Sequence, residues 1–177
     1  PPSPVPRLVA MPVVQRKVCM LGATAVGKTS LVKRFVESVF SEKYQATIGV
    51  KIDRKLVEIG ETTVSLLLWD LQGEDEFQRV RLSYLRGASG LIYVADGTRP
   101  ETLLTTRSLR ALAEENVGHV PSLLLLNKSD LGEQWALDDA FVEANGPTGI
   151  PMLRTSARTG DQVDAGFQQL VRRMLGT

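Results

Sequence analysis

Residues 22–29, Gly-Ala-Thr-Ala-Val-Gly-Lys-Thr, constrain the fold more than any other stretch of this chain. They match the pattern GxxxxGK[ST] and lie between an apolar run at 17–21 and helical apolar spacing at 29–40. The glycines allow a tight turn, so that several backbone N–H groups and the start of the helix face one phosphate group. We therefore predict a phosphate-binding loop rather than an ordinary strand-to-helix turn with a solvated lysine.

Within this loop, Lys28 is expected to bridge the β- and γ-phosphates, and the Thr29 hydroxyl is expected to bind Mg²⁺. The predicted phosphate contacts are Gly22, Ala23, Thr24, Ala25, Val26, Gly27, Lys28, Thr29 and Ser30.

Strands and helices are predicted to alternate along the rest of the chain. Strands are expected at 17–21, 51–59, 63–69, 90–95, 122–126 and 152–155, and helices at 29–40, 76–86, 101–115, 137–144 and 161–175. Gly60 and Glu61 separate two of the strands and predict an antiparallel hairpin. Apolar strands that alternate with amphipathic helices indicate a largely parallel sheet with helices on both faces, an α/β fold. Ligands bind such sheets beyond the carboxyl ends of the strands.

Length and composition exclude several other classes. The chain has 177 residues, which suits one domain, and its single cysteine, Cys19, rules out an intrachain disulfide. The net charge of +1 argues against nucleic-acid binding, and apolar runs such as the one at 123–126 are far too short to span a membrane. Proline-rich residues 1–14 are predicted to be a flexible tail, which leaves 15–177 as the domain.

An acidic residue and a glycine follow the strand predicted at 63–69. Asp70 is placed to act on the Mg²⁺ water shell, and Gly73 allows a backbone N–H to approach the γ-phosphate. Thr47, in the polar stretch before the hairpin, is a candidate second hydroxyl ligand when a triphosphate is bound. The predicted metal ligands are therefore Thr29, Thr47 and Asp70.

Two further motifs follow strands and favour guanine over adenine. The Asp130 carboxylate accepts two hydrogen bonds, which guanine offers at N1–H and at its 2-amino group. Asn127 and the Ala157 N–H suit the acceptor edge of the purine, while the Lys128 stem and Phe40 cover its two faces. Unpaired groups cost about 1–3 kcal/mol each, so adenine is disfavoured by roughly 10³-fold. The predicted base contacts are Asn127, Lys128, Asp130, Ser156, Ala157 and Phe40.

The chain resembles a small GTPase of the Ras superfamily, nearest to the Rab-like branch. The matching stretches are 22–29, 44–50, 69–70, 86–88, 127–130 and 155–158. The resemblance implies a P-loop NTPase fold with a six-stranded mixed sheet and about five helices. It also implies GTP/GDP binding with Mg²⁺, two mobile switch segments near 40–49 and 70–82, and effector, exchange-factor and activating proteins that bind there. Tyr44 and Arg158 join the implied nucleotide contacts, and the implied catalytic residues are Lys28, Thr47, Gly73 and Glu74.

One departure from the family pattern bears on catalysis. Glu74 stands where the family carries a water-positioning glutamine, and Gln72, two residues earlier, is a weaker substitute for it. A carboxylate only accepts hydrogen bonds, and at about 4 Å with an effective dielectric near 20 it repels a phosphate charge by roughly 4 kcal/mol. We therefore expect Glu74 to point away or to be protonated, and GTP hydrolysis to be slow.

Other departures bear on partners and location. The chain ends Met174-Leu175-Gly176-Thr177 without a cysteine that a lipid could modify, so no direct membrane anchor is expected in it. Ile52 stands where Rab-like proteins carry an aromatic residue on the partner-facing hairpin. We expect a cytoplasmic monomer, with any membrane association provided by partners or by a missing C-terminal tail.

Three functions remain open on the sequence. The first is a GTP-dependent switch with weak GTPase activity. The second is a GTP-binding regulatory or structural module with little or no hydrolysis. The third is a phosphate-loop kinase of small nucleotides, against which the segment 127–130 and the lack of an arginine-rich lid both argue.

Overall fold

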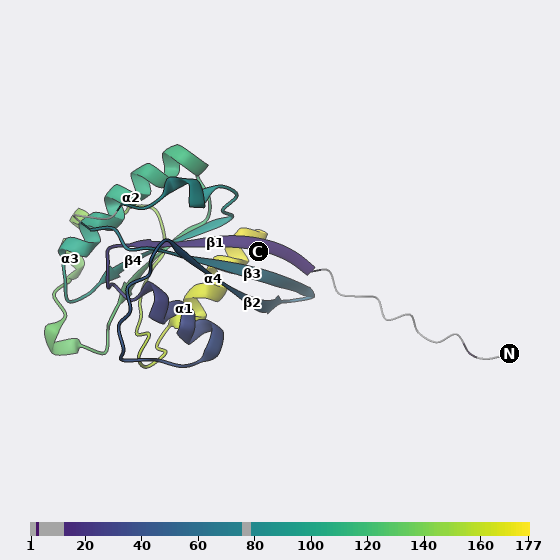
Figure 1. The fold of residues 1–177 in the computed structure, drawn as a ribbon, viewed down its shortest axis with the longest axis horizontal. Helices are drawn as coiled ribbons and strands as arrows, with labels where there is room; N and C mark the ends of the chain where they lie inside the picture. Colours follow the sequence, from purple (N-terminus) through teal and green to yellow (C-terminus); the bar gives the residue numbers. More distant parts are fainter. Residues whose placement is uncertain (1–2, 4–12, 76–78) are drawn as a thin grey trace.

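One mixed β-sheet organises the molecule. The computed structural model describes residue 3, residues 13–75 and residues 79–177 (Figure 1). Its strands are β1 (Val13–Gly22), β2 (Val50–Ile59), β3 (Thr62–Leu71), β4 (Gly90–Asp96), β5 (Ser122–Asn127) and β6 (Met152–Arg154). They lie in the order β2-β3-β1-β4-β5-β6, and the predicted six-stranded mixed sheet is confirmed.

The strand directions bring the predicted motifs to one edge of the sheet. Strand β1 is parallel to both β3 and β4, and β5 is parallel to β4 and β6, whereas β2 is antiparallel to β3. The register pairs Met20 with Asp70 and Asp96 with Asn127. The carboxyl ends of five parallel strands therefore meet at the edge where the phosphate loop begins.

Four α-helices cover the two faces in the described part of the chain. They are α1 (Lys28–Glu37), α2 (Glu101–Val117), α3 (Asp139–Asn145) and α4 (Val163–Leu175). Figure 1 shows α2 and α3 on one side of the sheet and α1 and α4 on the other. Phe35 of α1 stacks on Phe167 of α4 with ring centroids 4.1 Å apart, and both side chains are buried. None of these helices is long and apolar enough to cross a membrane.

Two sequence predictions about the elements are corrected. The helix expected at 76–86 is, in the residues that the structure describes, only a 3₁₀ turn, η1 (Leu82–Leu85), so the described chain has four α-helices rather than five. Residues 76–78 of that predicted helix lie outside the described residues. The first strand begins at Val13 instead of 17, so residues 13 and 14, assigned to the tail, belong to the sheet.

Other bounds shift by a few residues. The third strand extends through Leu71, so Asp70 lies inside β3 rather than beyond it. Helix α3 begins at Asp139 because the Asp138 side chain accepts a hydrogen bond from the Phe141 N–H, an N-cap that ends the preceding loop.

The Phe35–Phe167 stack yields a stability prediction. Phe35→Ala is expected to lower the free energy of unfolding by about 3–5 kcal/mol, because it removes a buried ring and leaves a cavity between α1 and α4. Urea denaturation of the nucleotide-loaded protein measures the change. Leu104→Ala, at a position 45% exposed, is the control and should stay within about 0.5 kcal/mol of the parent. Equal losses of unfolding free energy in the two variants would contradict the stabilising role of the Phe35–Phe167 stack.

Candidate functional site

The phosphate loop turns at Gly27, which adopts φ 104° immediately before α1. A Cβ at this position would lie 2.3 Å from Asn127 Nδ2, so both the backbone angle and the close approach require glycine. Helix α1 then begins at Lys28, with its N-terminus directed at the loop.

Lys28, at the end of the phosphate loop, is buried against the loop backbone. Its side chain is 6% exposed, and Nζ donates to the carbonyl oxygens of Gly22 (3.1 Å) and Ala23 (2.9 Å). Burial lowers the pKa of Lys28 to about 8, although the Asp70 carboxylate favours the charged form. The loop carbonyls thus hold the ammonium group where the sequence predicts a phosphate contact.

Thr29, Thr47 and Asp70 come together although they lie far apart in the sequence. Thr29 Oγ1 donates to Asp70 Oδ2 at 2.5 Å, and the Thr29 and Thr47 hydroxyl oxygens are 2.8 Å apart. Asp70 is 1% exposed, and its Oδ1 is buried without a hydrogen-bond partner in the described structure. Burial raises the pKa of Asp70, opposed by the Thr29 hydrogen bond and by Lys28.

This oxygen cluster fits Mg²⁺. Magnesium prefers oxygen ligands and uses few from the protein, since it keeps waters and binds substrate phosphates. Two hydroxyls and the Asp70 carboxylate, whose Oδ1 is buried without a hydrogen-bond partner in the described structure, match that preference. Within the described ranges, no cluster of three or more His, Cys, Asp or Glu side chains offers an alternative metal site.

The base-recognition residues form a second cluster at the ends of β5 and β6. Ser156 Oγ donates to Asp130 Oδ1 at 2.8 Å, which orients the carboxylate. Asn127 Oδ1 accepts from Thr155 Oγ1 (3.2 Å) and from the Ala157 N–H (3.3 Å). Asn127 Nδ2 donates to the Val26 carbonyl oxygen at 3.0 Å. The Asn127 amide, expected to contact the purine, therefore connects the base cluster to the phosphate loop.

A pocket of about 740 Å³ joins the two clusters. The predicted site residues that line it are Thr24, Ala25, Gly27, Lys28, Thr29, Ser30, Phe40, Tyr44, Thr47, Gly73, Asn127, Lys128, Asp130, Ala157 and Arg158. Gly22, Ala23, Val26, Asp70, Glu74 and Ser156 are not part of the lining. Lys33 and Leu131 line it as well, and no sequence motif marks either residue.

The Ras family model matches residues 17–176. The chain belongs to the Ras family. Membership supports GTP binding and GTPase activity in general, together with the interaction of such proteins with regulators and effectors. The pocket is therefore the candidate nucleotide site, and the segments around Thr47 and Gly73 are the expected first and second switch segments.

The second switch of this Ras-family chain is paired with the phosphate loop. The Glu74 N–H donates to the Gly22 carbonyl oxygen (3.0 Å), and the Thr24 N–H donates to the Glu74 carbonyl oxygen (3.2 Å). A Cβ at Gly73 would lie 2.4 Å from Thr24 Cα, so this approach requires glycine. The Glu74 backbone is thus fixed at the loop, while its side chain makes no hydrogen bond or ion pair that the described structure records.

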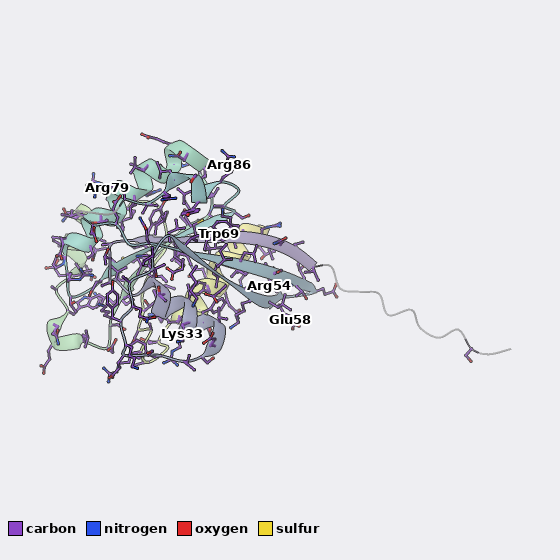
Figure 2. The ribbon with its side chains drawn as sticks, viewed as in Figure 1. Lys33, Arg54, Glu58, Trp69, Arg79 and Arg86 are labelled. Carbon is purple, nitrogen blue, oxygen red and sulfur yellow. The ribbon has the colours of Figure 1, made fainter. Side chains whose placement is uncertain are left out.

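Gln72 connects the two switch segments. Its Oε1 accepts from the Gly49 N–H (3.1 Å), its own N–H donates to the Gly49 carbonyl oxygen (2.8 Å), and its Nε2 donates to the Arg79 carbonyl oxygen (3.0 Å). Figure 2 shows Arg79 on the side of the sheet that carries α2, away from Glu58 near the turn of the hairpin. The sequence offers Gln72 as a weaker substitute for the water-positioning glutamine. In the structure its amide bonds backbone groups instead.

This bridge yields a prediction about the switch segments. Gln72→Ala removes the side-chain acceptor of the Gly49 N–H. That hydrogen bond is worth about 1 kcal/mol, so amide exchange at Gly49 is expected to accelerate roughly fivefold. Hydrogen exchange of the GDP-loaded protein measures this. Gln168→Ala, an exposed site on α4, is the control and should leave the exchange unchanged. An unchanged Gly49 rate in Gln72→Ala would show that the bridge does not restrain the segment.

Proposed function

We propose that this chain is a guanine-nucleotide-dependent switch that binds GTP and GDP with Mg²⁺ and hydrolyses GTP slowly. The observation that carries the proposal is the meeting of Thr29, Thr47 and Asp70 at 2.5 and 2.8 Å. It joins the phosphate loop, the first switch and β3 through the oxygen atoms that suit the metal. A ligand that attracts the Thr47 hydroxyl therefore also sets the conformation of the first switch.

Asp130 supports the choice of guanine. Ser156 holds one carboxylate oxygen and the carboxylate lines the pocket, which suits the paired donors of guanine. Adenine lacks that pair and would leave the carboxylate without its donors. The same cluster argues against a kinase of small nucleotides, because the segment 127–130 provides for selection of the base.

Glu74 supports slow hydrolysis. Its backbone is bonded to the phosphate loop, but its side chain is not among the residues that line the pocket. A carboxylate turned to the γ-phosphate would add like-charge repulsion of roughly 4 kcal/mol. The second candidate function, a GTP-binding regulatory or structural module with little or no hydrolysis, rests on the same residue.

Base selection is tested by competition. Purified protein with MgCl₂ should bind GTP at least about 10³-fold more tightly than ATP. Asp130→Ala should weaken GTP binding by about 10²-fold or more, because two charge-assisted hydrogen bonds are lost. Asp164→Ala, an exposed carboxylate on α4, is the matched control. Preference for ATP, or failure to bind guanine nucleotides with Mg²⁺ present, would refute the proposal.

Slow hydrolysis is tested by single-turnover measurements on the GTP-loaded protein. Glu74→Gln is expected to raise the rate by about tenfold or more, since it removes a repulsive charge and supplies both a donor and an acceptor. Glu115→Gln, exposed on α2, controls for the loss of one negative charge. An unchanged or lower rate in Glu74→Gln overturns the electrostatic argument.

The switch and the structural module differ in one measurable respect. Hydrogen exchange of residues 40–49 should differ between the GDP-bound protein and the protein bound to a non-hydrolysable GTP analogue if the chain is a switch. The same exchange pattern with both ligands supports the module. Partners of the switch are expected to bind residues 40–49 and the described part of 70–82.

A further inference from the structure

Three consecutive carbonyl oxygens of the phosphate loop each accept a hydrogen bond from a side chain outside the loop. Arg99 Nη2 donates to Thr24 at 2.8 Å, Lys128 Nζ donates to Ala25 at 3.0 Å, and Asn127 Nδ2 donates to Val26 at 3.0 Å. Asn127 and Lys128 belong to the base-recognition motif. Arg99 belongs to no motif and follows β4, a strand to which the sequence assigned no site residue.

Arg99 is held in this position by a buried carboxylate. Asp96, at the end of β4, is 1% exposed and accepts from Arg99 Nε at 3.1 Å. It pairs also with Lys128 Nζ at 2.7 Å and accepts from the Thr98 N–H (2.8 Å) and Thr98 hydroxyl (2.7 Å). Burial alone would raise the pKa of Asp96, but the bonds from Lys128 and Thr98 hold it below its ordinary value.

One carboxylate thus orients two of the three side chains that bind the loop carbonyls. Arg99 and Lys128 both donate to Asp96. Arg99 also donates to the Thr24 carbonyl oxygen, and Lys128 donates to that of Ala25. A peptide unit is planar and trans, so its C=O and N–H point in opposite directions. Fixing the Thr24 carbonyl on the outer side of the loop therefore fixes the direction of the Ala25 N–H.

We propose that Arg99 is a positioning residue for nucleotide phosphates: it holds the Thr24–Ala25 peptide so that the Ala25 N–H faces the pocket. Ala25 lines the pocket and Arg99 does not, so Arg99 acts through the backbone rather than by touching phosphate. Its charge polarises the peptide group that it binds, which makes the N–H a stronger donor to an anion. The proposal deepens the proposed function and rests on it.

The test compares ligands that differ in phosphate number. Arg99→Ala is expected to weaken binding of GDP by about tenfold, the loss of one charge-assisted hydrogen bond, and to change binding of GMP by less than about twofold. Arg99→Lys, which keeps the charge and a donor, should recover part of the loss. Arg107→Ala, an exposed arginine on α2, is the control and should bind GDP as the parent does.

A second measurement separates positioning from a loss of fold. In the GDP-loaded protein, amide exchange at Ala25 should accelerate in Arg99→Ala and in Asp96→Asn, while core amides of β4 stay protected. Equal weakening of GDP and GMP, or no weakening of either, overturns the proposal. If Arg99→Ala does not fold, Arg99→Lys provides the test. A GDP affinity below that of the parent, with unchanged GMP affinity, supports the proposal. A GDP affinity equal to that of the parent overturns the proposal. Failure of the parent protein to bind GDP overturns the proposed function itself.

Discussion

The conformation of the phosphate loop depends on hydrogen bonds to its outer side. A loop that directs N–H groups inward to an anion directs its carbonyl groups outward, and buried carbonyl oxygens need donors. Those donors come from the ends of β4 and β5, through Arg99, Lys128 and Asn127. Because Asn127 also bonds Thr155 and the Ala157 N–H in the base cluster, the phosphate and base halves of the pocket share this support.

The switches depend on this loop in turn. The second switch pairs with Gly22 and Thr24 through the Glu74 backbone, and the first reaches Thr29 through the Thr47 hydroxyl. Gln72 then bonds Gly49 on one side and Arg79 on the other. Both switches are thus held at the loop by a small number of hydrogen bonds, each worth about 1 kcal/mol. Interactions of that size are strong enough to order a segment and weak enough for a ligand to replace.

Sequence alone predicted the sheet and much of the site because the signals there are local. Apolar runs predicted the six strands, and the phosphate-loop pattern identified Lys28 and Thr29 before any geometry was known. Sequence could not predict the contacts of Arg99 and Gln72, because each side chain bonds a backbone group that lies far away in the sequence. It gave no signal for Lys33, which lines the pocket. The helix predicted at 76–86 is wrong in the described residues, because the apolar spacing of this stretch is too sparse to give a helix one buried face; only a 3₁₀ turn forms at Leu82–Leu85.

The structure also bears on why Gln72 is a poor replacement for a catalytic glutamine. An amide that positions water must be free to accept from the water and donate to phosphate at the same time. The Gln72 amide accepts from Gly49 and donates to Arg79, and its side chain does not line the pocket. Turning it inward would break both side-chain bonds, at a cost of about 2 kcal/mol before any gain from water. Position 72 therefore keeps its amide for the switch backbone, and position 74 offers only a carboxylate. The placement of both side chains thus supports the slow hydrolysis proposed for this chain.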